Sequence, residues 1–189
     1  MADTVLREAE LQQAAREQAA WHRVKRRLSQ VVLYPEAQRL LRAVEAENQT
    51  PNERRPDRPH ERAPGHRQPR GGRREDRTGE RTAHQISNLI NLALAAQSPE
   101  DIAAYLDHQS RRDRLQEFYR PLVQMFQDWR TGLVTQAEQE VRAVLGTKEQ
   151  PAKTLLSLSR SRFLLDLFLE FCQHLRAHHA YLIATQGGH

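Results

Sequence analysis

The chain has 189 residues, of which 38% are hydrophobic, and it carries a formal net charge of +5. This length allows one ordinary domain, or one domain with an appendage, and the single cysteine, Cys172, excludes an internal disulfide and a cysteine-based zinc site. Because no apolar run approaches the roughly 20 residues that cross a bilayer and the N-terminus lacks a signal-peptide pattern, we expect a soluble, cytoplasmic protein without membrane contact.

The first part of the chain is predicted to be a helical hairpin, residues 1–49. Residues 4–33 should form one long helix, because apolar side chains recur at the spacing of one helix face: Trp21, Val24, Leu28 and Val31. Pro35 is then well placed as the first residue of a second, shorter helix. Two helices alone expose too much apolar surface to be stable, so the hairpin should dock on the C-terminal part or on another subunit.

Residues 50–81 are predicted to be a disordered, arginine-rich linker. This stretch contains no Val, Ile, Leu, Met, Phe, Tyr, Trp or Cys, and its five prolines and four glycines interrupt any helix. It cannot bury enough apolar surface to offset the entropy lost on ordering. Its ten arginines outnumber its six acidic residues, so the linker holds +4 of the net charge of +5.

The remaining residues, 82–189, should form a helical bundle of about five helices. Thr82 is expected to cap the first of them. Residues 98–101, Ser-Pro-Glu-Asp, have the pattern of a capped helix start, and residues 110–113, Ser-Arg-Arg-Asp, repeat it. Pro151 should open the last and most apolar helix, which ends near Thr185. Since no alternating, strand-like pattern occurs, the predicted fold class is all-α.

Three residues are expected to bend or end helices within this bundle. Pro121 should kink or end a helix near Arg120, Gly132 should stop the next helical stretch, and Gly146 should cap the one after it. The core is predicted to be built largely by aromatic and leucine side chains of the last helix: Phe163, Phe168, Phe171, Leu175 and Tyr181.

The linker contains one arginine–glycine motif, Arg-Gly-Gly-Arg-Arg at residues 70–74. Guanidinium groups on a flexible chain can neutralise phosphates and stack on bases without a fixed surface. Arg70, Arg73 and Arg74 are therefore candidate RNA-binding residues. The alternative is a solvated linker whose acidic residues offset its charge.

Arg111, Arg112 and Arg114 cluster at an expected helix start, where positive charge opposes the helix dipole, and this placement would be favourable if a phosphate lay in front of that helix. Arg160 and Arg162 make the first half of the last helix polar and basic. The candidate phosphate contacts on helices are Arg111, Arg112, Arg114, Arg120, Arg160 and Arg162. A solvated helix face or intramolecular ion pairs would explain the same clusters.

No residues in the sequence form a recognisable catalytic or metal-binding set. His174 and His178 have the i, i+4 spacing that can share a metal, but Cys172 and His179 point to other faces of the helix and no third ligand is present. We expect a partly buried histidine strip instead. Phosphate-binding glycine loops and nucleophile elbows are also missing from the sequence. The chain is therefore predicted to be no enzyme and to need no cofactor.

Two stretches resemble one protein family. Residues 114–119, Arg-Leu-Gln-Glu-Phe-Tyr, followed by Leu122 and Val123, are similar to a Leu-x-x-Phe-Tyr motif in the small α-helical subunit of type III CRISPR effector complexes. The spaced phenylalanines of the last helix and the Ala-His-His-Ala-Tyr at 177–181 resemble that subunit's terminal helix. The resemblance implies a non-catalytic antiviral-defence subunit, stacked in small copy number, whose arginines contact guide or target RNA backbone without reading bases.

We therefore expect a non-enzymatic, RNA-associated subunit of a ribonucleoprotein. Its expected partners are RNA backbone, the other subunits of the complex and further copies of itself. One alternative is a protein-interaction adaptor in which residues 50–81 are a flexible spacer. Another is a small helical ribonuclease.

Overall fold

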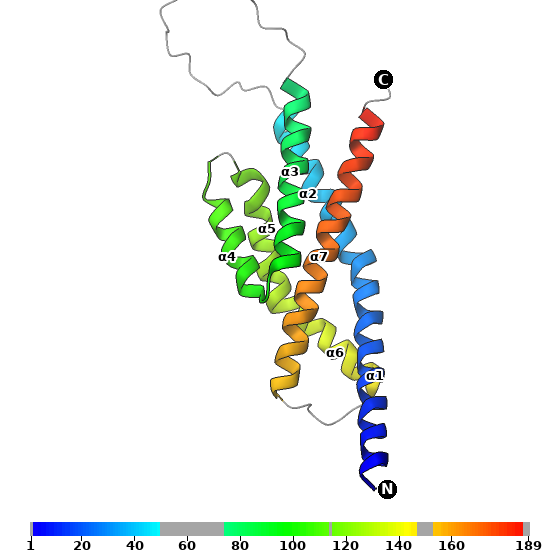
Figure 1. Ribbon diagram of the computed structural model, residues 1–189. Helices are drawn as coiled ribbons and strands as arrows, with labels where there is room; N and C mark the ends of the chain where they lie inside the picture. Colours follow the sequence, from blue (N-terminus) through cyan, green and yellow to red (C-terminus); the bar gives the residue numbers. More distant parts are fainter. Residues whose placement is uncertain (1, 50–73, 114, 147–152, 187–189) are drawn as a thin grey trace, which may run out of the picture.

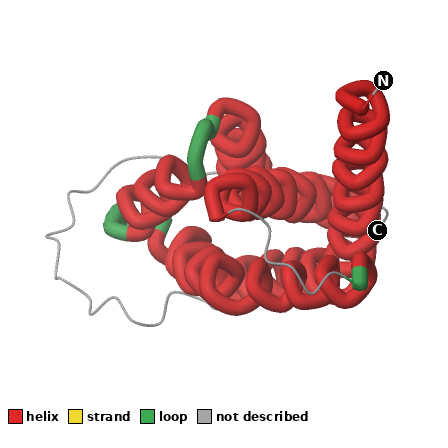
Figure 2. The backbone as a smooth tube through the Cα atoms, turned by 90° about the horizontal axis from the view of Figure 1, so that it is seen from below, coloured by secondary structure: helices red, strands yellow, loops and turns green. Residues whose placement is uncertain are grey.

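In the computed structural model the protein folds into an elongated helical bundle (Figure 1). The structure describes residues 2–49, 74–113, 115–146 and 153–186. Within these ranges the regular elements are all helices, and no strand occurs in them. Seen from below, the described backbone is almost entirely helical, with short loops (Figure 2). The predicted all-α fold is confirmed. Residues 50–73 of the predicted linker lie outside the described residues.

The N-terminal part is one bent helix and not the expected hairpin. Helix α1 (Ala2–Leu28) continues through a π-helical turn, η1 (Ser29–Leu33), into α2 (Tyr34–Gln49), as Figure 1 shows. The backbone N–H of Tyr34 donates to the carbonyl of Ser29, five residues earlier. Pro35 has no N–H to donate, and π-helical turns are a common cause of bends. The proline therefore follows a bend within the helix and starts no new element.

The π-helical turn changes which side chains face the core. Val24 and Leu28 are buried as predicted, but Val31 is 68% exposed. The 3.6-residue spacing holds only in a continuous α-helix, so the apolar positions lose their phase at η1. Leu33 is fully buried in place of Val31.

The bent helix docks on the rest of the same chain. Helix α2 packs along α7 (Lys153–Gln186), and α1 packs against α6 (Val134–Leu145). One hydrophobic cluster joins buried residues of both parts, from Ala20 in α1 to Leu175 in α7. The predicted N-terminal and C-terminal domains thus share a single core.

Helix α3 (Arg74–Ala95) begins earlier than the expected Thr82, so residues 74–81 of the predicted linker are helical. The last proline of this stretch is Pro69, and arginine and glutamate are good helix formers. Gly79 lies inside the helix and costs only about 1 kcal/mol relative to alanine. The low apolar content of residues 74–81 predicted disorder. They are helical nevertheless, because they belong to a longer helix, α3, that packs on α7.

One of the two predicted helix starts is confirmed and the other is wrong. At the start of α4 (Pro99–Ser110), the Ser98 side chain accepts a hydrogen bond from the Asp101 N–H at 3.3 Å, and the Asp101 carboxylate accepts one from the Ser98 N–H at 2.9 Å. Ser110, in contrast, is the last residue of α4, and its hydroxyl donates to the carbonyl of Asp107. Helix α5 (Gln116–Asp128) starts after Leu115 without a side-chain cap.

A second bent helix is formed by α5, the π-helical turn η2 (Trp129–Leu133) and α6. Pro121 lies inside α5, and Gly132 lies inside η2. The prediction that Gly132 stops the helix is therefore wrong. Gly146 does end α6 as predicted, with a φ of 63° and its N–H donating to the Arg142 carbonyl at 3.0 Å.

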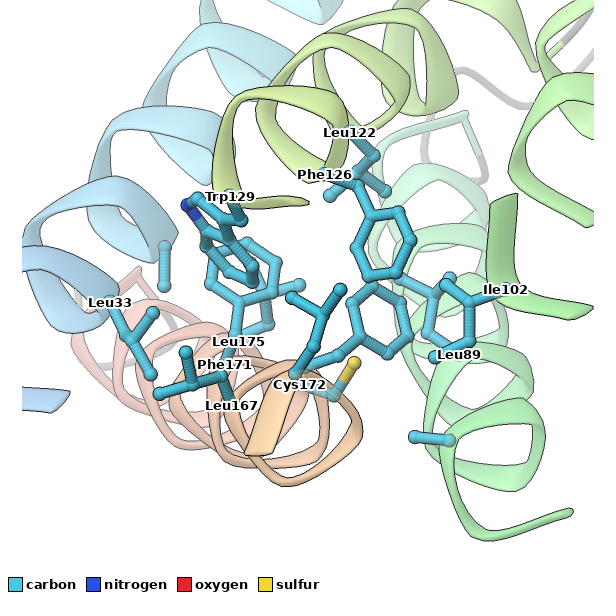
Figure 3. Packing of buried hydrophobic residues seen from close by; sticks show 14 of the residues in the cluster. Leu33, Leu89, Ile102, Leu122, Phe126, Trp129, Leu167, Phe171, Cys172 and Leu175 are labelled. Carbon is cyan, nitrogen blue, oxygen red and sulfur yellow. The ribbon is translucent and has the colours of Figure 1, made fainter. Parts of the chain in front are cut away.

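Helix α7 packs against α1, α2, α3, α4 and α6, and it supplies much of the core (Figure 3). Phe168 packs edge-on against Phe126 with ring centroids 5.3 Å apart, and Phe171 packs in the same way against Trp129. The residues predicted to form the core are buried, with one exception. Tyr181 is 62% exposed, because it lies beside the buried row of α7 and not within it.

Candidate nucleic-acid interface

Two of the candidate arginines lie at the turn between α4 and α5. Arg111 caps the C-terminus of α4, and Arg112 follows it. The Arg111 guanidinium donates to the Asp107 carboxylate at 2.6 Å, and that of Arg112 lies 3.2 Å from Nε2 of His108. Both arginines remain exposed. They were expected at a helix start, but at a helix C-terminus the dipole favours positive charge, so their position alone does not call for an anion.

The other candidates near this turn are only partly described. Arg120 is exposed on α5, and among the described side chains no carboxylate lies within 4.0 Å of it. Arg114, Arg70 and Arg73 lie outside the described residues. Arg74 is the first residue of α3.

Arg160 has a partner inside the protein. Its Nε and one terminal nitrogen donate to the two carboxylate oxygens of Glu138 on α6. Glu138 is only 3% exposed, and its hydrogen bond raises the pKa of the Arg160 guanidinium. Since an unpaired buried carboxylate is costly, Arg160 serves the packing of α6 on α7. Its neighbour Arg162 is exposed.

The basic residues in the last turn of α1 are also paired across helices. Nζ of Lys25 lies 3.9 Å from Asp166 and 3.8 Å from Glu170, both on α7. Arg27 forms an ion pair with Glu140 on α6. These contacts join α1, α6 and α7, so part of the basic face of α1 is neutralised by the fold.

The fold places the candidate arginines toward opposite ends of the bundle (Figure 1). The turn between α4 and α5, the end of α2, the start of α3 and the end of α7 lie toward one end. The first turns of α7, which carry Arg160 and Arg162, lie toward the other. The arginine-rich sequence 50–73 connects α2 to α3, and it is therefore attached at the end that also holds Arg111 and Arg112.

A strip of tyrosine and histidine side chains runs along the contact between α7 and the bent N-terminal helix. We call it the Tyr–His strip, and it consists of Tyr34, His174, His178 and Tyr181. The Tyr34 ring meets the rings of His174 and His178 edge-on, at centroid distances of 5.6 and 6.5 Å. The ring of Tyr181 is stacked on His178, 6.1 Å away and inclined by 18°.

Neighbouring polar side chains hold the Tyr–His strip in place. The Ser29 hydroxyl and Nε2 of His174 share a hydrogen bond of 2.8 Å, and Gln38 donates to the Tyr34 hydroxyl at 2.9 Å. Neither Tyr34 nor Ser29 was predicted from the sequence to be a functional residue, and Tyr181 was predicted to lie in the core. The spacing of His174, His178 and Tyr181 on one helix face was a usable signal. No local signal links them to Tyr34, which is far away in the sequence.

The partly buried histidine strip predicted for His174 and His178 is present near the end of α7, with His174 half-buried and His178 6% exposed. His179, which was expected on another face, is also buried and is 9% exposed. Nε2 of His178 is buried without a hydrogen-bond partner. Burial lowers the pKa of His179, while Glu45 and a hydrogen bond to the backbone of Gly79 act in the opposite direction. In the part of the chain that the structure describes, no three His, Cys, Asp or Glu side chains are grouped as metal ligands.

A groove of about 380 Å³ lies between α2 and α5. Its lining is mainly apolar, with Glu36, Arg39, Gln124 and Asp128 among its polar residues. Burial raises the pKa of the Glu36 carboxyl, and the hydrogen bond that it accepts from Nε1 of Trp129, at 3.1 Å, opposes this effect. A groove of this size and lining can take part of an apolar ligand or a peptide side chain.

Comparison with known proteins adds no relative. The chain matches no protein-family model, no curated protein sequence and no solved structure. Among the described helices, none combines the length and the apolar character that spanning a membrane requires.

Proposed function

We propose that this chain is a non-catalytic, RNA-associated helical subunit of a ribonucleoprotein, which contacts RNA backbone through arginines. The observation that carries this proposal is that two exposed arginines lie at the end of the bundle where the arginine-rich sequence 50–73 joins α2 and α3. Arg111 and Arg112 are exposed at the turn between α4 and α5, and the arginine-rich sequence 50–73 is attached at the same end.

The chemistry of these arginines suits a polyanion. Among the described residues, the side chains of Arg111 and Arg112 form hydrogen bonds with groups one turn earlier in α4. An ion pair as exposed as that of Arg111 with Asp107 contributes little to the free energy of folding. A phosphate can therefore replace water at these guanidinium groups without breaking a tertiary contact. Guanidinium groups match phosphate oxygens in a bidentate manner, and each neutralised phosphate releases counterions.

The resemblance to the small subunit of type III CRISPR effector complexes supports a place within a larger assembly. That subunit family is α-helical, as are the regular elements in the described part of this chain. The assignment would make guide or target RNA the ligand, and other subunits and further copies of the chain the protein partners. Arginine contacts to the backbone would position the RNA without reading its sequence.

The test is a salt titration of RNA binding by the full chain. Filter binding of a labelled single-stranded RNA should weaken steeply as salt rises. In the Arg111→Ala/Arg112→Ala variant, the slope of log affinity against log salt should fall by about 0.7 for each phosphate that the protein no longer neutralises. The matched control, Lys25→Gln/Arg27→Gln, removes two cations that are already paired within the fold and should leave the slope unchanged.

Two outcomes would overturn the proposal. One is the absence of RNA binding at low salt, both for the isolated chain and within its native assembly. The other is an equal slope for the wild type and the Arg111→Ala/Arg112→Ala variant. The labelled RNA should also remain intact after incubation. Cleavage that disappears in a His108→Ala variant would favour the ribonuclease alternative, because His108 is in contact with Arg112.

The groove between α2 and α5 favours a second candidate function, a protein-interaction adaptor. Apolar grooves rimmed by a few polar groups receive apolar side chains of partner helices or peptides. Deleting residues 50–73 separates the two functions. An adaptor that uses this groove keeps its partner, whereas an RNA-associated subunit loses affinity for RNA. An Ala43→Glu substitution, at an exposed position that lines the groove, should have the opposite pair of effects.

A further inference from the structure

We infer that Tyr181, stacked on His178, is a platform on which an unpaired RNA base stacks. This inference rests on the proposed RNA-associated function and adds a second kind of contact to it. The arginines would hold the backbone through charge, and the Tyr–His strip would hold a base through its aromatic face.

The geometry of Tyr181 is that of a ring supported from one side. Its ring is nearly parallel to that of His178, with an inclination of 18° and a centroid distance of 6.1 Å. His178 is 6% exposed, while Tyr181 is 62% exposed. The imidazole therefore limits the orientations of the tyrosine ring, while much of that ring stays open to solvent. A ring that is already oriented loses less conformational entropy when a ligand stacks on it.

A second exposed ring belongs to the same strip. Tyr34 is 42% exposed, and its ring touches both His174 and His178 edge-on. The hydrogen bond from Gln38 to its hydroxyl restrains it further. Both tyrosines thus use the same buried histidine, His178, as support. Rows of exposed aromatic rings are the usual platform for unstacked bases in proteins that bind single strands.

Polar side chains flank the Tyr–His strip. The Ser29 hydroxyl shares a hydrogen bond with Nε2 of His174, and the Gln38 amide donates to the Tyr34 hydroxyl. The flank of the strip is therefore polar as well as aromatic. The end of α7 lies toward the same end of the bundle as the turn that carries Arg111 and Arg112 (Figure 1). An RNA strand that contacts Arg111 and Arg112 and also reaches Tyr181 would therefore cross this end of the bundle.

The experiment measures binding of the full chain to two probes, a single-stranded oligouridine RNA and heparin, a polyanion without bases. Tyr181→Ala should weaken RNA binding by about 5- to 100-fold, which corresponds to the usual loss of one base–aromatic stack. The same variant should bind heparin as the wild type does, and its salt slope should be unchanged because the arginines still neutralise the same phosphates. Tyr181→Phe keeps the aromatic face and should retain wild-type affinity for RNA.

Ile183→Ala is the matched control, because Ile183 is an exposed apolar residue two positions further along α7, with 52% of its surface exposed. It should leave binding of both probes unchanged. Since Tyr181 is largely exposed, all three variants should unfold at the same denaturant concentration as the wild type. This check excludes loss of fold as the cause of weaker binding.

The outcomes separate this inference from the proposed function. If the wild type binds RNA and Tyr181→Ala binds it equally well, base stacking at Tyr181 is wrong, while phosphate binding by the arginines stands. If Tyr181→Ala loses a protein partner but keeps its RNA affinity, the platform serves that partner and the inference is also wrong. If the wild type binds no RNA, both proposals are wrong.

Discussion

Arginines and lysines meet different surroundings in two regions of this protein. Where α1, α6 and α7 meet, Lys25, Arg27 and Arg160 pair with carboxylates that come from other helices. At the turn between α4 and α5, the side chains of Arg111 and Arg112 form hydrogen bonds only with groups of the preceding helical turn among the described residues. The number of arginines in a region therefore does not show whether they are available to a ligand. Their availability depends on whether the group that each one contacts lies on another helix or on the same helix.

The energies of the two kinds of contact differ for a physical reason. Glu138 is buried, so its ionised carboxylate needs the guanidinium of Arg160 to offset lost hydration. The pair of Arg111 and Asp107 is exposed on both sides, with 76% and 52% of the side chains accessible. Water and salt screen such a pair, and its net contribution is small. The first region uses arginine to join helices, whereas the side chains of Arg111 and Arg112 form no ion pair with another helix among the described residues.

The largest expected effect concerns the core that both regions share. Phe168→Ala should lower the free energy of unfolding by about 3–5 kcal/mol, because it removes a fully buried ring that packs on Phe126. Amide hydrogen exchange should speed up together in α1 and in α4. Faster exchange in only one of them would show that the two regions unfold independently, against the single core described above.

An intermediate effect distinguishes the two kinds of arginine directly. Arg160→Ala leaves the carboxylate of Glu138 buried without its partner and should cost roughly 2 kcal/mol in the free energy of unfolding. Arg111→Ala should change it by no more than about 0.5 kcal/mol. Urea denaturation of both variants measures the difference. Equal losses would remove the contrast between the regions.

The smallest expected effect is a pH dependence at the end of α7. Burial lowers the pKa of His179 below its usual value of 6.5, so below that pH the unfolded chain binds a proton more readily than the folded one. The stability that comes from the neutral histidine is complete above pH 6.5 and is lost as the pH falls through the folded-state pKa. His179→Gln should therefore lose less stability on acidification than the wild type.

Thermal unfolding at a series of pH values between about 5 and 7.5 provides the measurement. His22→Gln is the control, since His22 is exposed on α1, and it should keep the acid-side decline of the wild type. A decline in His179→Gln as steep as in the wild type would contradict the assignment to His179.

The parts of the fold that sequence predicted correctly depend on local signals. The reciprocal hydrogen bonds of Ser98 and Asp101 and the left-handed Gly146 involve residues at most four positions apart. The apolar spacing of α7 identified Phe163, Phe168 and Phe171 as core residues. The two π-helical turns were missed, because the sequence next to Pro35 and Gly132 is also typical of helix ends. In the folded protein, tertiary packing favours continuous helices at both places, α1–η1–α2 and α5–η2–α6.

The candidate interface was harder to predict from the sequence, because whether an arginine is available to a ligand depends on its contacts with distant residues. The clustering of Arg111 and Arg112 was visible, but nothing local showed that they follow α4 and do not begin a helix. The pairing of Arg160 with Glu138 joins residues 22 positions apart. Tyr181 looked like a core residue because aromatic side chains in apolar helices usually are buried. It is exposed because it lies beside the buried row of α7 and not within it.

Because of the π-helical turn η1, one bent helix can pack against two different neighbouring helices. It is equivalent to a single residue inserted into an α-helix, and each residue rotates the following side chains by about 100° around the axis. Helix α1 can therefore match the surface of α6 while α2 independently matches that of α7. Deleting one residue from Ser29–Leu33 would couple the two orientations, and only one of the two surfaces could then be matched.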